Sequence, residues 1–485
     1  MELTAATILS ISLVSLAILV SLLSRKSTPN SKEKRPPGPR CLPFIGSLLH
    51  LLTSQPQAAL RDLAKKHGPV MYLRLGQVDT VVISSPAAAQ EVLRDSTLTF
   101  ASRPSLLATE IMCYGNTDMA FAPYGVYWRT MRKLCTVELL SSRKVRQFAP
   151  IRDSETMSLV RNVRLAGGDG RPVNLGKLLV SCANAIAAKA TFGDGCDAGL
   201  QEQFLSAIDV GIKFSARGEL DAVFGKIIAG CEARRQEKKT TGDDDDHLLS
   251  VMLRMKGEGG FELPITTTNI QAIIQDMFTG GTETTSSTVE WIMSELMRNP
   301  DVMARAQTEV RGTFENQSPQ DHEALMNKLE YTRMVIKEGM RLHPALPLLL
   351  PRVCRETCEV GGFEVTAGSR VMVNAWAIAR NPEYWGDDGD EFRPERFEGT
   401  ATDHNGSHFE YLPFGSGRRM CPGSNFGLGM LELILARLLY YFNWSLPAGI
   451  RPHELDMDMV VSATARRRNP LHLVATPYNV PMEIS

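Results

Sequence analysis

The chain lacks several features that would place it in other protein classes. Its 485 residues carry a formal net charge of -1, so no overall field favours binding to nucleic acid. Its nine cysteines are odd in number and unpaired in spacing, which fits a reducing compartment better than a disulfide framework. Cys354 and Cys358 lie close in sequence, but no second pair or histidine cluster accompanies them, so we interpret both as structural. With 43% hydrophobic residues, the chain can bury a large core in one to three domains.

One long apolar run lies at the N-terminus. The 21 residues from Leu3 to Leu23 carry no charge and would span about 31 Å as a helix, near the thickness of a bilayer core. Basic residues follow the run directly, which predicts an outside N-terminus and a cytoplasmic main body. No basic residue precedes the run and no cleavage site is clear, so we favour a retained anchor over a signal peptide. We expect an anchor at 1–24, a basic, proline-rich hinge at 25–40 and one domain at 41–485.

A glycine-rich segment near the C-terminus, FGSGRRMCPG from Phe414 to Gly423, places Cys421 before an expected helix. That helix would begin at Pro422 or Gly423, and its free N–H groups favour a thiolate over a thiol. Glycines let the backbone approach a flat ligand, and Arg419 offers a cation to an acidic group on it. These are the properties of a thiolate ligand to haem iron. A buried structural cysteine is the alternative.

A helical pattern over 270–298 is interrupted at 279–285 by TGGTETT. Adjacent glycines, Gly280 among them, weaken a helix, and hydroxyl side chains can take over backbone hydrogen bonds. Glu283 and Thr284 present an acid and an alcohol side by side, as a proton relay requires. The alternative is a flexible kink with a surface glutamate.

Two further sets of side chains have helical spacing. Trp128 and Arg132 lie four residues apart, so an indole N–H and a guanidinium share a face that suits a carboxylate. Glu338 and Arg341 lie three apart, and Arg396 is a candidate second cation for the same carboxylate.

These patterns resemble the motifs of the cytochrome P-450 family. The matching motifs are W-x-x-x-R at 128–132, [AG]-G-x-[DE]-T-[ST] at 280–285, E-x-x-R at 338–341, P-E-R-F at 394–397 and F-x-x-G-x-R-x-C-x-G at 414–423. The resemblance covers nearly the whole chain and is nearest to plant A-type members, particularly cereal oxidases of pimaradiene-type diterpenes. It implies a mainly α fold with small β-sheets and an N-terminal transmembrane helix.

The resemblance also implies roles for individual residues. Cys421 would bind the iron of haem b, with Glu283 and Thr284 delivering protons to bound dioxygen. Other residues would surround the haem or its propionates: Trp128, Arg132, Arg352, Phe414, Arg419 and Gly423. Glu338, Arg341 and Arg396 would form a structural triad. Electrons would come from NADPH through a membrane-bound flavoprotein reductase, at the endoplasmic reticulum.

The segments that the resemblance places around the substrate are apolar. They comprise the loop from Ser102, the stretch HPALPLLLPR, which we expect to be a strand, and a hairpin with its tip around 460–463. The expected lining residues are Leu106, Ile111, Met112, Gly280, Leu346, Leu348 and Val461. No arginine or lysine among them invites an acidic substrate, so a bulky hydrocarbon such as a diterpene fits.

One region departs from the family. Between two expected helices, 200–214 and 219–239, the longer connection that normally roofs the pocket looks shortened, near 214–220. The run GDDDDH at 242–247 is expected to be a solvated loop before a helix at Leu248. Three interpretations of the shortening remain open: a genuine short form, a mis-spliced gene model or a decaying paralogue. A thiolate-haem isomerase or dehydratase is the other alternative, which the retained acid–alcohol pair argues against.

Overall fold

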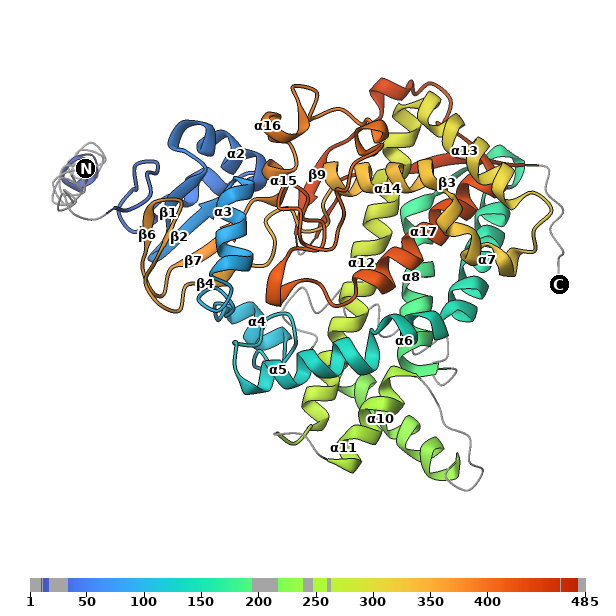
Figure 1. The fold of residues 1–485 in the computed structure, drawn as a ribbon, viewed down its shortest axis with the longest axis horizontal. Coiled ribbons are helices and arrows are strands. Elements are labelled where there is room, and N and C mark those ends of the chain that lie inside the picture. The colour runs from blue at the N-terminus through green and yellow to red at the C-terminus, as the bar shows by residue number, and fades with distance from the viewer. Residues whose placement is uncertain are drawn as a thin grey trace, which may run out of the picture. The chain divides into compact units, whose positions relative to one another are not determined.

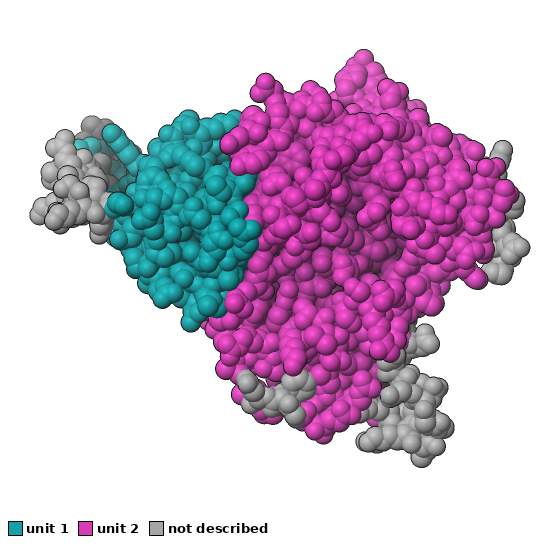
Figure 2. Space-filling view, in the orientation of Figure 1, with its two compact units in different colours: residues 1–102, 348–378 teal, residues 103–347, 379–485 magenta. Residues whose placement is uncertain are grey.

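The computed structural model describes residues 10, 12–16, 34–193, 217–238, 247–259, 263–462 and 464–478. The chain divides into two compact units, unit 1 (Met1–Ser102 and Leu348–Ile378) and unit 2 (Arg103–Pro347 and Ala379–Ser485), coloured separately in Figure 2. The expected anchor lies almost wholly outside the described residues, as does the expected helix 200–214. None of the described helices is both long and apolar enough to cross a bilayer.

Unit 1 is built on a four-stranded sheet in the order β1-β2-β7-β4. β1 (Val70–Leu75) pairs antiparallel with β2 (Val78–Ile83), which confirms the two strands predicted there. β2 pairs parallel with β7 (Arg370–Val373), and β7 pairs antiparallel with β4 (Arg352–Val353). Side chains from β1 and β2 pack on Leu60 of α2 and are fully buried, so this face of the sheet forms the core of the unit.

The other elements of unit 1 are short. They are α2 (Pro56–His67), α3 (Pro86–Gln90) with a π-helical turn (Glu91–Asp95), α15 (Ala375–Ile378), and the hairpin of β5 (Cys358–Val360) with β6 (Phe363–Val365).

Unit 2 is organised around one long helix, α12 (Thr267–Arg298), which packs against α8 (Leu175–Phe192), α14 (Glu330–Leu342) and α17 (Ser424–Tyr441) (Figure 1). Thr266 and Asn269 cap its first turn reciprocally. The helix continues through Gly280 and Gly281 without a break. Most of its side chains are buried, since other helices cover it on several sides, and this rigid element therefore fixes the position of the predicted Glu283–Thr284 segment.

Further helices and small sheets complete unit 2. The helices are α4 (Leu107–Met112), α5 (Val126–Lys133) with a π-helical turn (Leu134–Leu139), α6 (Ser142–Gln147), α7 (Ala149–Ala166), α10 (Arg217–Lys238), α11 (Leu248–Glu258), α13 (Pro300–Phe314) and α16 (Pro382–Trp385). The sheets are β3-β11-β8 (Pro172–Asn174, His472–Pro477, Phe442–Ser445) and β9-β10 (Met459–Val461, Ala465–Arg467).

Several local predictions are confirmed. α10 covers the helix expected at 219–239, and α11 begins at Leu248 as expected, with the side chain of His247 accepting the Ser250 N–H. β9 and β10 form the expected hairpin. α17 begins at Ser424, slightly later than predicted, because Gly423 is its N-cap.

The strand expected in HPALPLLLPR is wrong. Residues 343–351 form turns, and extended pairing begins only at Arg352. Prolines remove the N–H donors that a ladder needs, and Leu349 adopts a φ of 48°, which is incompatible with a strand. The apolar loop expected from Ser102 also contains a short helix, α4.

Candidate active site

Cys421 closes the glycine-rich loop that precedes α17. Its N–H donates to the carbonyl of Phe414 at 3.0 Å. Between them Gly415 and Gly417 have φ angles of 69° and 70°, in the left-handed region that glycine adopts without steric cost. The Cys421 thiol faces the N–H of Gly423, so backbone groups on both sides of the side chain fix the position of the sulfur.

The Cys421 residue is solvent-accessible although its sulfur lies deep within unit 2. That depth raises the pKa of the thiol by desolvation, and the Gly423 N–H and Arg132 oppose the rise only in part. Burial therefore outweighs the helix N-terminus that the sequence predicted to favour the thiolate. A bound metal cation would reverse this balance, because a coordinating thiol is deprotonated.

Trp128 on α5 and Arg419 from the glycine-rich loop form a cation–π pair. The Arg419 guanidinium carbon lies 4.2 Å from the Trp128 ring centroid. Both residues donate to the carbonyl of Met119, Trp128 through Nε1 at 3.1 Å and Arg419 through Nη1 at 3.3 Å. Arg419 also donates to the carbonyl of Ala122 at 2.5 Å. The structure thus brings Trp128 together with Arg419, and its indole N–H is directed at a backbone carbonyl.

Arg132 lies one turn further along α5. It is half-buried, and no hydrogen bond or ion pair joins its guanidinium to any other residue that the structure describes. Desolvation lowers its pKa, while Cys421 and Cys135 oppose that shift. A half-buried guanidinium without an anion is costly, so Arg132 suits an anionic ligand group close to the cysteine.

The middle of α12 presents the predicted acid and alcohol. Gly280 is exposed although its helix is largely buried, and a Cβ at this position would meet no other heavy atom of the described residues within 4 Å. The Thr284 hydroxyl donates to the Gly280 carbonyl at 2.5 Å, and Glu283 is half-buried beside it. The hydroxyl therefore shares its proton with the helix backbone and must rotate before it can serve a ligand.

The predicted triad is joined by short contacts. Glu338 accepts two hydrogen bonds from Arg341, at 2.7 and 2.8 Å, and one from Arg396 Nε at 2.8 Å. Arg341 also donates to the carbonyls of Ala379 and Gly389. The Glu338 and Arg341 side chains are fully buried, so this cluster fixes the segment after α14 and takes no part in chemistry.

The expected lining residues are divided between the units. Ile111 and Met112 on α4 are half-buried, as are Leu346 and Val461, all in unit 2. Leu348 belongs to unit 1, as does Arg352, which was predicted as a propionate contact. There Arg352 Nη1 donates to the carbonyl of Phe100 at 3.3 Å, and desolvation lowers the pKa of Arg352 to about 10.

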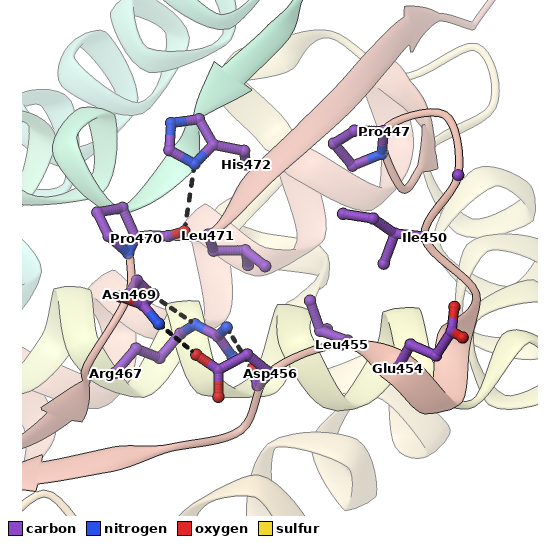
Figure 3. A pocket seen from close by; sticks show the side chains of 11 residues that line it. Pro447, Ile450, Glu454, Leu455, Asp456, Arg467, Asn469, Pro470, Leu471 and His472 are labelled. Atoms are coloured by element: carbon purple, nitrogen blue, oxygen red, sulfur yellow. Dashed lines mark hydrogen bonds between the residues drawn. The ribbon is translucent and has the colours of Figure 1, made fainter.

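A surface pocket of about 290 Å³ in unit 2 contains none of the predicted site residues (Figure 3). Its polar side chains are engaged with one another: Asn469 Nδ2 donates to Asp456 Oδ2 at 2.6 Å, and Arg467 Nη2 donates to the Asp456 carbonyl at 2.5 Å. The pocket therefore offers no convergent set of groups for chemistry.

Sequence reasoning missed two acids, Asp118 and Asp276, which hold the loop that carries Met119. Asp276 accepts the Met119 N–H at 2.6 Å, and Asp118 accepts the Phe121 N–H at 3.2 Å. Asp118 is the only charged residue between Glu110 and Arg129, and Asp276 is the only one between Glu262 and Glu283. Such an isolated acid was the available signal.

The cytochrome P450 family profile matches residues 36–216 and 212–470. This chain belongs to the cytochrome P450 family. The 9-beta-pimara-7,15-diene oxidase of Oryza sativa subsp. japonica is 59% identical over 98% of this chain and 97% of its own length. Cytochrome P450 99A2 of the same organism is 58% identical over 99% of this chain and 94% of its own.

A zebra fish cytochrome P450 solved with abiraterone shares the fold. It superposes with a TM-score of 0.75 at 24% identity and covers 88% of this chain and 100% of its own. The mainly helical P450 fold is thereby confirmed, and the chain is a cytochrome P450 monooxygenase.

The residues of this P450 fit a haem. Cys421 is accessible and held by its loop, so it would ligate the iron. The half-buried Arg132 guanidinium, which has no partner among the described residues, would pair with an acidic group of the haem. The open space beside Gly280 would leave room for a large ligand. When bound, haem supplies dioxygen activation, and thiolate ligation favours O–O cleavage. Cys421 would hold the iron and Arg132 would pair with a propionate.

Proposed function

We propose that this P450 hydroxylates a diterpene hydrocarbon or an early oxidation product of one. The observation that carries the proposal is 59% identity, over nearly the full length of both chains, to an enzyme named as a pimaradiene oxidase. The apolar segments expected around the substrate agree with it, because Leu106, Ile111, Met112 and Val461 offer contact area and no charge.

The protein's own groups would divide the work. Apolar side chains would orient the hydrocarbon and exclude water. Thr284 would turn its hydroxyl from the Gly280 carbonyl towards the ligand, and Glu283 would resupply the proton from the half-buried side of α12. Cys421 would stay deprotonated under the charge of the iron.

We also propose that the chain is a single-pass protein of the endoplasmic reticulum membrane that takes electrons from an NADPH-dependent flavoprotein reductase. The uncharged run at 3–23 and the basic residues after it support the anchor. Exposed basic side chains on α5 and α6 support an acidic partner: Arg129, Lys133, Arg143 and Arg146.

We also propose that the connection near 214–220 is shorter in this chain than in its relatives. The alignment with cytochrome P450 99A2 spans 515 positions, 30 more than this chain has residues, so at least 30 positions face a gap in this chain. The family match also falls into two parts that meet at 212–216. The alignment length supports a loss of residues, and the break in the family match supports its position near 214–220, where it would alter the roof over the substrate.

The test is a carbon monoxide difference spectrum of the reduced protein in microsomes, followed by turnover of 9-beta-pimara-7,15-diene with NADPH and a plant reductase. We expect a strongly red-shifted Soret band and a hydroxylated product detected by mass spectrometry. A red-shifted band with NADPH-independent conversion would favour an isomerase or dehydratase. An unshifted band, or none, would mean that the shortened chain is a defective paralogue or the product of a mis-spliced gene.

A further inference from the structure

Two acids from separate elements lie near the cation–π pair of Trp128 and Arg419. Asp276 projects from α12, and Asp118 lies in the loop 113–122 that precedes α5. Asp276 accepts the N–H of Met119, the residue directly after Asp118, so the two carboxyl groups are close neighbours, and we call them the carboxyl pair. Two ionised carboxylates cannot share such a site at low cost, so one proton between them is the stable arrangement.

The carboxyl pair holds the loop through backbone N–H groups. Asp276 Oδ2 accepts the Met119 N–H at 2.6 Å, and the Ala120 N–H also faces this carboxyl. Asp118 accepts the Phe121 N–H at 3.2 Å through both oxygens. Successive N–H groups of one short segment are thus divided between the two acids, which ties the loop to α12.

The loop needs such an attachment because its backbone is strained. Tyr114 and Asn116 have φ angles of 51° and 57°, on either side of Gly115 at 70°. A bulky aromatic residue in the left-handed region persists only where surrounding contacts impose it. The loop conformation therefore depends on contacts such as that of the Tyr114 hydroxyl with Asp221 and those of the carboxyl pair.

Met119 links the loop to the residues expected to hold the haem, which we call the cofactor side of the site. Its N–H binds Asp276, and its carbonyl accepts from both members of the cation–π pair. A shift of this one peptide would displace Trp128 and Arg419 together, and Arg419 lies two residues before Cys421.

We propose that the carboxyl pair shares one proton and, through the Met119 peptide, positions the cation–π pair for haem binding. Asp118 and Asp276 are positioning residues, since neither touches the reacting atoms. The assignment goes beyond the proposed substrate and stands whether or not the substrate is a diterpene.

The electrostatic setting agrees with a retained proton. Desolvation raises the pKa of Asp118 to about 6 and that of Asp276 well above its usual range, and the charge of Asp118 raises the pKa of Asp276 further. The titratable or charged groups that face the pair are Cys113, Tyr127, Cys135 and Arg419. Among them, Arg419 is the cation, and its charge favours ionisation of Asp118.

The sign of the pH effect follows from these raised values. A carboxyl whose folded-state pKa exceeds its unfolded value of about 4 contributes most to stability at low pH. That contribution is lost as the pH rises through the folded-state values, first near 6 for Asp118 and then higher for Asp276. Haem retention should therefore weaken on the alkaline side, where both acids become charged and the loop loosens.

The experiment measures haem transfer from the purified holoprotein to excess apomyoglobin as a function of pH. In the wild type we expect the rate of haem loss to rise about tenfold between neutral and alkaline pH. Asp276→Asn should flatten this rise, because the amide accepts the Met119 N–H and donates to Asp118 without a titrating proton. Asp118→Asn should reduce the rise, because the ionised Asp276 then faces no second carboxylate.

Two further variants make the test strict. Asp276→Ala should lose haem about tenfold or more faster at all pH values, because the Met119 N–H has no acceptor. Glu290→Gln is the matched control. Glu290 is another acid on α12 whose pKa is raised by burial. It accepts the Leu471 N–H instead, and its charged neighbours are Arg467 and His472. Its pH profile should follow the wild type.

Retention of the full alkaline rise in Asp276→Asn would overturn the shared proton. Wild-type haem loss in Asp276→Ala would overturn the positioning role. If Asp276→Ala does not fold, the comparison of the two asparagine variants with the wild type decides alone.

Discussion

The cofactor side of the site is assembled from separate stretches of chain, whereas the α12 side comes from a single helix. On the cofactor side, the loop 113–122, α5 and the glycine-rich loop meet through hydrogen bonds to backbone carbonyls. On the α12 side, helix geometry alone places Glu283, Thr284 and the Gly280 carbonyl. The difference predicts that cofactor-side changes alter haem retention, whereas α12 changes alter the use of electrons.

Removing the sulfur should have the largest effect. Cys421→Ser should abolish the red-shifted carbon monoxide band, because a hydroxyl at this position stays protonated and is a poor iron ligand. The measurement is the difference spectrum of the purified protein. A normal band in the serine variant would show that another group binds the iron, and the comparison of the two sides would have to be redrawn.

Breaking the cation–π pair should have the next largest effect. Arg419→Gln removes the donors to Met119 and Ala122 and the cation above Trp128, so haem loss should accelerate about tenfold or more. Arg418→Gln, at the exposed neighbouring position, is the control and should not change the rate. Equal rates of haem loss in the two variants would show that the contacts of Arg419 with Met119, Ala122 and Trp128 do not hold the cofactor side together.

A change on α12 should leave haem in place and waste electrons. Thr284→Ala should lower product formed per NADPH consumed by about two- to tenfold, because the relay loses its hydroxyl. The measurement pairs NADPH oxidation with product and peroxide yields. Thr288→Ala, one turn later and bonded to the Thr284 carbonyl at 2.7 Å, should remain coupled. Full coupling in Thr284→Ala would remove the relay role.

The same difference explains how much the sequence could predict. Glu283 and Thr284 follow from one helical stretch, and the β9–β10 hairpin and α11 follow from local pattern and turns. The partner of Trp128 could not be predicted in this way. Spacing placed it with Arg132 on α5, but the fold brings Arg419 from almost 300 residues away onto its ring.

The missed acids and the wrong strand have physical causes of the same kind. Asp276 lies within the helix that the sequence predicted, yet its role depends on a loop more than 150 residues earlier. In HPALPLLLPR, apolar character suggested a strand, but proline and the positive φ of Leu349 prevent a ladder. The local sequence pattern predicts a helix or a strand. The partners of a buried charge depend instead on which distant segments the fold brings together.

Arg132 should affect haem loss less than Arg419 does, and it should give the sharpest separation between the apo and holo states. As a half-buried guanidinium without a partner among the described residues, it costs stability in the free protein and gains an anion only from a bound ligand. Arg132→Gln should therefore leave the apoprotein's melting temperature equal or higher, and accelerate haem loss by about three- to tenfold. Arg129→Gln, exposed on the same helix, should change neither quantity. A lower melting temperature with unchanged haem loss would make Arg132 a structural residue, and the cofactor side would then hold its ligand through Cys421 and the cation–π pair.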